Sequence, residues 1–159
     1  MDETPEWERY SLTDEQAAKL IAEALGCVVT WTRRDGHPAA AYVAHVIIDG
    51  QIYMTAPKSR AKNAALRRDP RTAVVFENAE LGEVTIIGHV EFDGRPEIGM
   101  RVLAAIADKY NVSGNQREFF IRALDTPGRT YFRLVEEKRF SMNTAKASTY
   151  LRGGDPPRK

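Results

Sequence analysis

The 159 residues contain one cysteine, Cys27, so the chain cannot form an intrachain disulfide or a zinc site built from cysteines. Cys27 stands at the edge of an apolar run, a place more typical of a small buried hydrophobe than of a nucleophile. Histidine is scarce too, and His37, His45 and His89 show no i, i+4 pair and no carboxylate pattern. We therefore expect no metal site.

Neither sign of charge is in excess, because 23 lysines and arginines balance 22 aspartates and glutamates. A nucleic acid would therefore meet no broad basic surface, and neither would an anionic membrane. The longest apolar runs, such as residues 39–48, are far shorter than the ~20 residues of a membrane-spanning helix. Residues 1–6 are acidic, unlike the start of a secretory signal, which predicts a cytoplasmic protein without a membrane partner.

The sequence also lacks the common signatures of nucleotide-binding and hydrolytic sites. It has no G-x-G-x-x-G or Walker sequence, and its expected elements do not alternate as strand, helix, strand, which disfavours a Rossmann-type domain. A Gly-x-Ser-x-Gly elbow is absent, and no Ser, His, Asp constellation is visible, which disfavours a hydrolase. No residue is assigned a catalytic role from these patterns.

Alternating apolar residues and turn signals predict a mostly β fold of the α+β kind. Asp49-Gly50 is a strong two-residue hairpin signal, and Thr13 with Gln16 forms a helix capping box. Strands are expected at residues 27–33, 38–48, 51–55, 71–77, 84–92 and 129–139, and helices at 13–25, 60–67, 96–110 and about 115–124. About six antiparallel strands with flanking helices suit a closed or partly closed barrel, which removes exposed strand edges. We predict one domain over residues 1–150 and a disordered tail over 151–159.

The most informative stretch is T-A-P-K-S-R-A-K at residues 55–62, at the expected junction of a strand and a helix. Lys58, Arg60 and Lys62 supply positive charge there, and the first turn of a helix adds unpaired N–H groups. Ser59 is predicted to cap the helix or to contact an anion. The pattern indicates a phosphate site, and a solvated basic helix is the alternative with the same spacing.

Residues 53–70, with S-R-A-K followed by L-R-R-D-P, resemble the pyridoxamine 5'-phosphate oxidase-like superfamily, whose members are split β-barrels that bind FMN or the deazaflavin coenzyme F420. The resemblance covers about residues 13–141 and includes the D-G-H-P and D-G-Q-I-Y turns and the V-T-I-I-G-H-V-E-F strand. The R-A-K and L-R-R-D-P pieces are most similar to the branch that uses F420. The resemblance implies that Arg60 and Lys62 lie beside the cofactor phosphate and that the cofactor lies across the interface of a homodimer.

The resemblance also implies that the second strand, at Ala40, Ala41, Tyr42 and Val43, runs along the cofactor ring. Small residues there would let a flat ring approach the backbone, and they would equally suit tight packing in a barrel. Thr55 is a further candidate for a hydrogen bond to the ring or phosphate, although threonine is also a common strand residue.

These features predict an oxidoreductase that uses F420, with FMN as the second choice, on a small organic substrate. F420 continues beyond its phosphate into a chain of glutamates, whose carboxylates would be attracted to Lys58, Arg67, Arg68 and Arg71. FMN ends at its phosphate and would gain little from these residues.

Three alternatives remain open at this point. One is a pyridoxamine 5'-phosphate oxidase-type enzyme, although the C-terminal substrate signature of that enzyme is not visible at residues 130–146. Another is a flavin-binding protein without turnover, because binding and catalysis would use the same anchoring residues. The third is a heme-binding protein, for which His45 or His89 would be the axial ligand.

Overall fold

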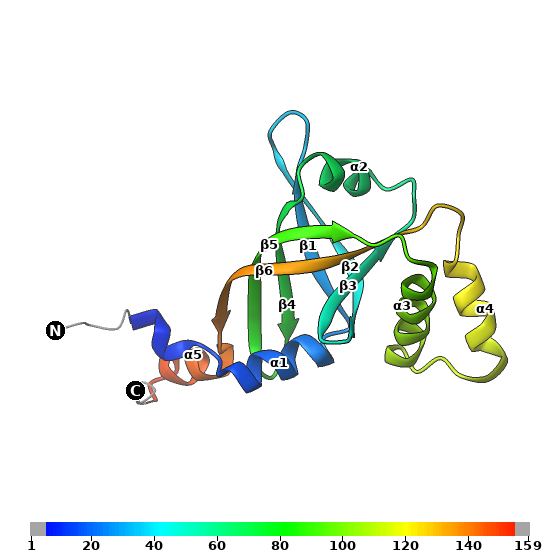
Figure 1. The fold of residues 1–159 in the computed structure, drawn as a ribbon. Coiled ribbons are helices and arrows are strands. Elements are labelled where there is room, and N and C mark those ends of the chain that lie inside the picture. The colour runs from blue at the N-terminus through cyan, green and yellow to red at the C-terminus, as the bar shows by residue number, and fades with distance from the viewer. Residues whose placement is uncertain (1–5, 155–159) are drawn as a thin grey trace.

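Six antiparallel strands form a closed barrel in the computed structural model, which describes residues 6–154 (Figure 1). The strands are β1 (Gly26–Thr32), β2 (Pro38–Ile48), β3 (Gln51–Ala56), β4 (Arg71–Asn78), β5 (Gly82–Phe92) and β6 (Thr130–Met142). Around the barrel they follow the order β1-β2-β3-β6-β5-β4, and β1 closes the barrel by pairing with β4. The predicted fold class, a mostly β split barrel with flanking helices, is confirmed.

Helices lie at both ends of the barrel and along one side (Figure 1). They are η1 (Glu6–Tyr10, a 3-10 helix), α1 (Asp14–Glu23), α2 (Ala61–Arg68), α3 (Pro96–Lys109), α4 (Gly114–Leu124) and α5 (Thr144–Leu151). In Figure 1, α1 lies across the lower end of the barrel, α2 lies at the upper end, and α3 and α4 stand together at the side. None of the helices described within residues 6–154 is long and apolar enough to cross a membrane.

Local sequence signals place most of these elements. Thr13 caps α1 through the predicted capping box, in which its side chain accepts a hydrogen bond from the backbone N–H of Gln16. Asp49 and Gly50 both adopt positive φ angles, 50° and 75°, as a two-residue turn between antiparallel strands requires. The predicted strands and helices are all present, with small shifts at their ends.

Two helices, η1 and α5, lie outside the predicted elements. Asn143 caps α5 by accepting a hydrogen bond from the Lys146 N–H at 3.0 Å, and its own N–H donates to the Tyr10 carbonyl. The Tyr10 and Tyr150 rings also meet, with centroids 6.2 Å apart. These contacts join the two ends of the chain, which a local sequence pattern cannot reveal. Leu151 ends α5, and residues 155–159 of the predicted tail lie outside the described residues.

The predicted capping role of Ser59 is wrong. Helix α2 begins at Ala61, and its N-cap residue is Arg60, whose side chain makes no capping hydrogen bond. The chain first turns over Pro57–Arg60, where the Arg60 N–H donates to the Pro57 carbonyl at 3.1 Å. Ser59 therefore lies inside this turn, one residue ahead of the cap position.

The molecule has two apolar clusters, one inside the barrel and one under α3. Side chains that fill the barrel include Leu20, Met54, Phe76 and Phe132. The second cluster joins α3 to β2 and β3 through Val46, Tyr53, Val102 and Ile106. Cys27 belongs to the barrel cluster and is 1% exposed, and burial raises the pKa of its thiol to about 12. The interpretation of Cys27 as a buried hydrophobe is confirmed.

His45 is buried in the barrel wall and acts as a structural residue. Its Nε2 lies 2.7 Å from the Ile21 carbonyl, and its ring meets the Phe76 ring edge-on with centroids 4.8 Å apart. Lys109 of α3 donates to the His45 carbonyl at 3.0 Å and so joins α3 to β2. Burial lowers the pKa of His45 to about 4.

The free energy of unfolding is expected to fall as the pH is lowered from 6.5 toward 4. In this range the unfolded chain takes up a proton on His45 and the folded chain does not, so protonation favours unfolding by at most about 1.4 kcal/mol per pH unit. The His45→Gln variant, which keeps a donor for the Ile21 carbonyl, should lose most of this slope. Urea unfolding at pH 7.0 and 4.5 measures it, with His37→Gln in the exposed β1–β2 turn as the control. An unchanged slope in His45→Gln would contradict the prediction.

Candidate functional site

A pocket of about 700 Å³ lies between β2, the start of α2 and the α3–α4 pair, and is called the main pocket below. Its volume is in the range of small-molecule and cofactor sites. The side chains around it come from six elements and their connections: Trp31, Ala41, Tyr42, Val43, Ala44, Thr55, Pro57, Arg60, Ala61, Lys62, Ile106, Tyr110, Phe120, Leu124 and Arg129. Of the predicted site residues, Ala41, Tyr42, Val43, Thr55, Arg60 and Lys62 are brought together here. Ala40, Lys58 and Ser59 are not among the lining residues.

Positive charge gathers where β3, α2 and β6 meet. Arg60, Lys62 and Arg129 line the main pocket there, and none of the described residues that line it is an aspartate or a glutamate. Burial lowers the pKa of Arg129, as it does that of Lys62, for which the neighbouring Arg60 guanidinium adds a second lowering effect. An anion bound here would meet three cations without a competing carboxylate.

Lys62 is the strongest sign that the pocket accepts an anion. It is only 7% exposed, and within the described part of the chain no hydrogen bond or ion pair reaches its ammonium group. The ammonium nitrogen itself is open to the pocket, because it is not among the buried, unpartnered polar atoms of the described residues. A cation that has lost part of its water and has no protein partner favours a bound anion. An anionic ligand in the pocket would supply the partner that the described residues do not provide.

Asn63 holds the loop that carries these cations, and the sequence patterns did not reveal it. Its amide nitrogen donates to the Pro57 carbonyl at 2.7 Å, and its amide oxygen accepts from the Thr130 hydroxyl at 2.8 Å. The side chain is 5% exposed. Asn63 thus ties the turn before α2 to β6, and this pre-organises Arg60 and Lys62 on the pocket edge.

Arg129 is a second site residue that the sequence did not indicate. Arg129 follows Gly128, which has a φ of 72°, a conformation that favours glycine. The Lys58 side chain packs on Gly128, and a Cβ added there would lie 2.6 Å from the Lys58 Cδ. The Arg129 guanidinium donates to the Leu124 carbonyl and, at 3.3 Å, to the Thr55 hydroxyl. Arg129 is thereby held over the pocket, far in sequence from Lys62.

Thr55 lines the pocket, and its hydroxyl makes hydrogen bonds within the protein. Its hydroxyl donates to the Thr130 carbonyl at 2.9 Å and accepts from Arg129, so its hydrogen is already used within the protein. We therefore interpret Thr55 as a residue that positions Arg129, rather than as a donor to a cofactor.

Strand β2 forms the floor of the pocket through Ala41, Tyr42 and Val43. Tyr42 is 64% exposed, and its ring lies over Gly26 of β1, where an added Cβ would stand 2.4 Å from the ring. Any larger residue at Gly26 would push the ring outward. Small residues on this strand leave backbone accessible beside the pocket, as expected for a surface that contacts a flat ring.

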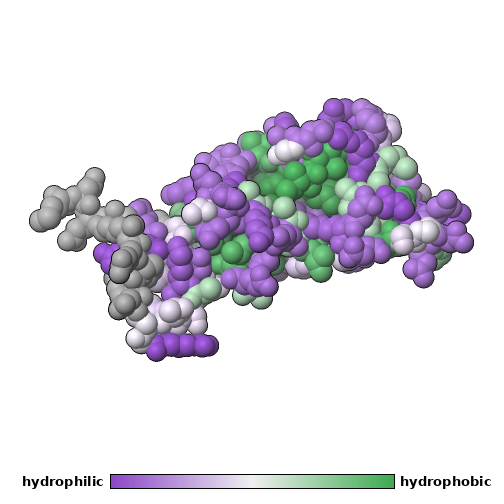
Figure 2. Space-filling model, turned by 90° about the horizontal axis from the view of Figure 1, so that it is seen from below, coloured by the Kyte–Doolittle hydropathy of each residue, from purple (hydrophilic) through white to green (hydrophobic). Residues whose placement is uncertain are grey.

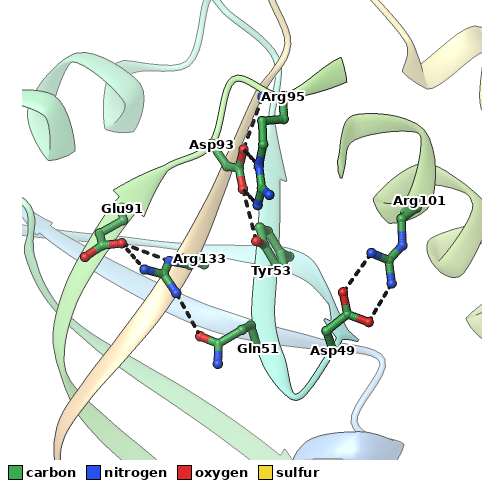
Figure 3. A network of polar contacts seen from close by, with 8 residues as sticks. All are labelled: Asp49, Gln51, Tyr53, Glu91, Asp93, Arg95, Arg101 and Arg133. Atoms are coloured by element: carbon green, nitrogen blue, oxygen red, sulfur yellow. Dashed lines mark hydrogen bonds and ion pairs between the residues drawn. The ribbon is translucent and has the colours of Figure 1, made fainter. Parts of the chain in front are cut away.

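A network of polar contacts fixes α3 beside the pocket (Figure 3). Arg101 pairs with Asp49 of the β2–β3 turn through two hydrogen bonds of 2.8 and 2.7 Å. At the start of α3, Asp93 accepts from Arg95 at 2.7 Å and from the Tyr53 hydroxyl at 3.1 Å. The Arg95 hydrogen bond is the main reason that the pKa of Asp93 lies well below its usual range. The network sets the position of the helix that supplies Ile106 and Tyr110 to the pocket wall.

Neither histidine that was considered as a heme ligand lies in the main pocket. His45 is fully buried, and His89 lies on the outer face of β5, 2.8 Å from Glu137. Among residues 6–154, no three histidine, cysteine, aspartate or glutamate side chains gather as metal ligands would. The chemistry of the pocket is thus set by cations and apolar side chains.

Comparison with known proteins supports this assignment of the fold. Residues 12–129 match the family described as pyridoxamine 5'-phosphate oxidase. No curated protein matches the sequence. A conserved hypothetical protein from Mycobacterium tuberculosis has a similar structure, with a TM-score of 0.76 and 20% identity over 88% of this chain and 90% of its own.

Two further solved structures have the same fold. One is an F420 reductase, with a TM-score of 0.63 and 16% identity over 80% of this chain and 98% of its own. The other is HutZ, the heme storage protein from Vibrio cholerae, with a TM-score of 0.64 and 14% identity over 81% of this chain and 94% of its own. These likenesses concern the fold, whereas the family match spans most of the sequence: the protein belongs to the pyridoxamine 5'-phosphate oxidase family.

Proposed function

We propose that this protein binds F420, or FMN as the second choice, in the main pocket and acts as an oxidoreductase on a small organic substrate. The observation that carries the proposal is Lys62, a nearly buried cation for which the described residues supply no partner, at the cationic end of a cofactor-sized pocket. The similar fold of an F420 reductase supports the choice of cofactor class.

In this proposal the cofactor phosphate is bound by Arg60, Lys62 and Arg129, and the ring lies along β2 beside Ala41 and Val43. The bound cofactor would supply hydride or electron transfer. The protein binds its anionic part, orients its ring and excludes water through the apolar pocket walls. This division of work explains why the sequence carries no recognisable catalytic motif.

A second cavity favours F420 over FMN. It has a volume of about 390 Å³, shares Trp31 and Ala61 with the main pocket, and is called the hairpin groove below. Its charged lining residues are Arg33, Arg34, Asp35 and Arg68. Asp35 pairs with Arg33 at 2.9 Å, and Arg68 donates to the Thr32 carbonyl at 2.6 Å. In the described part of the chain no carboxylate pairs with Arg34 or Arg68, so the groove keeps a net positive charge. An acidic chain that continues beyond the phosphate would find these two guanidinium groups next to the main pocket.

The hairpin groove changes which basic residues are expected to meet that chain. Helix α2 separates Arg68, in the groove, from Arg67, which stacks on Phe92 at 3.9 Å beside another pocket. Arg71 is paired with Asp69 at 2.7 Å and so is already neutralised. Lys58 packs over Gly128 and lines neither the main pocket nor the hairpin groove. Of the four basic residues expected to meet the acidic chain, which were Lys58, Arg67, Arg68 and Arg71, we therefore keep only Arg68, and we add Arg34.

We further propose a homodimer with the cofactor at the interface. Figure 2 shows an apolar area in the middle of the face seen from below, surrounded by hydrophilic residues. An exposed apolar area of this kind is typical of an interaction surface. Leu25, Tyr42 and Ile47 are among the large hydrophobic side chains that the single chain leaves exposed. Light scattering at micromolar concentration should give the dimer mass, and a monomer mass would overturn this part of the proposal.

Titration of the purified protein with FMN and with F420, followed by fluorescence, tests the proposed function. We expect saturable binding, tighter for F420 at low salt. Oxidation of the bound, reduced cofactor by small organic acceptors would then separate an enzyme from a storage protein. Absence of binding by both cofactors would overturn the proposal, and a Soret band after heme titration would replace it with the heme-binding alternative.

A further inference from the structure

The wall of the main pocket opposite β2 is apolar. It is built by α3 and α4, through Ile106, Tyr110, Phe120 and Leu124. No charged side chain of these two helices lines the pocket, and the Tyr110 hydroxyl points away to the Leu25 carbonyl at 3.3 Å. Arg60, Lys62 and Arg129 lie outside these two helices. One end of the pocket is therefore cationic and suited to an anion, whereas the α3–α4 side carries no charge.

Helix α4 presents its apolar face to the pocket without burying it completely. None of its residues is buried, and Phe120 and Leu124 are only partly covered by the apolar cluster under α3. Its polar anchor is Arg117, which pairs with Asp108 and donates to the Ala104 carbonyl at 3.3 Å. An apolar ligand that covers this open apolar surface would gain free energy from the hydrophobic effect.

Aromatic side chains dominate this part of the pocket. Trp31 and Tyr42 stand on the strand side, and Tyr110 and Phe120 on the helix side. Rings of this kind recognise other flat rings through stacked and edge-on contacts, and they offer little to a charged group that must lose its water. The strand side faces the proposed cofactor ring, so the Tyr110 and Phe120 rings of the helix side are the ones left to select a substrate with an uncharged aromatic body.

We propose that the α3–α4 wall binds an uncharged aromatic substrate and that Phe120 determines this preference. The inference rests on the proposed function, because the substrate would lie between the wall and a ring bound along β2. Phe120 projects from α4 into the pocket, whereas its neighbour Phe119 is 68% exposed and does not line it. These adjacent phenylalanines form a matched pair of one pocket residue and one surface residue.

The test uses protein loaded with the cofactor that binds, and two probes of one shape: uncharged 2-naphthalenemethanol and anionic 2-naphthoate. Equilibrium dialysis should show at least fivefold tighter binding of the alcohol. Phe120→Ala should weaken binding of the alcohol about tenfold, and Phe119→Ala should leave it within about twofold. Phe120→Gln, which retains length but adds a polar amide, makes the same test if Phe120→Ala does not fold.

Equal binding of the two probes, or equal losses in the Phe119 and Phe120 variants, would overturn the inference. Cofactor titration of the same samples keeps the two proposals apart. Intact cofactor binding with no discrimination between the probes contradicts only the substrate preference. Failure of the wild-type protein to bind either cofactor contradicts the proposed function itself.

Discussion

Replacing Lys62 by methionine is expected to weaken cofactor binding by about 10- to 150-fold and to raise the Tm of the cofactor-free protein. The loss of affinity corresponds to about 1.5–3 kcal/mol, the usual cost of removing a hydrogen bond to a charged group. The gain in stability has a separate cause. Burial lowers the pKa of Lys62, so its charged form is less favourable in the folded chain than in the unfolded one at neutral pH. Methionine has a similar shape and no charge to bury.

Arg60→Met is the control for this prediction. Arg60 lines the same pocket but is exposed, so its removal should also lower affinity, by about 1–3 kcal/mol, without raising the Tm. Isothermal titration and thermal unfolding of both variants measure the two effects, with about 2–4 °C expected for each kcal/mol of stability. Full affinity in both variants would remove this pocket as the anion site. A Tm of Lys62→Met below that of the wild type would show that Lys62 has a partner within the fold.

The double variant Arg34→Ala/Arg68→Ala is expected to weaken F420 binding about tenfold at low salt and to leave FMN binding unchanged. Both guanidinium groups line the hairpin groove, which adjoins the main pocket at Trp31 and Ala61. Only a ligand with carboxylates beyond its phosphate reaches them. Exposed charge pairs contribute up to about 1 kcal/mol each and are screened by salt, so the difference should shrink as salt rises.

Two comparisons make this second prediction specific. Arg71→Ala removes one exposed arginine that Asp69 already neutralises, and it should leave F420 affinity within about twofold. F420 without its glutamates should bind the wild type and the double variant equally well. If FMN binds more tightly than F420 at both low and high salt, or copurifies with the protein at full occupancy, the F420 assignment is wrong and FMN replaces it.

Much of the barrel was predictable because its signals are local. The positive φ angles that Asp49 and Gly50 adopt belong to the dipeptide, and the capping box of Thr13 and Gln16 spans a single helical turn. Such preferences act between residues that are close in the sequence, so they depend little on how the rest of the chain folds. The cap position was wrongly assigned to Ser59 because the turn before α2 depends on contacts with residues far away in the sequence. The turn over Pro57–Arg60 is closed in part by Asn63 and Thr130, and Thr130 comes from the last strand.

The sequence by itself determined the order of the strands and helices, because the signals that begin and end them lie between near neighbours. It also determined the cluster of Lys58, Arg60 and Lys62, because these residues are close together in the chain. Only the tertiary structure decided how far each of these cations is covered, since Lys62 and Arg60 both line the pocket but only the Lys62 side chain is largely buried. It also brought Arg129 to Lys62 and placed the α3–α4 wall opposite β2. Barrel closure and side-chain packing depend on contacts between residues far apart in the chain, so a pattern of neighbouring residues cannot predict them.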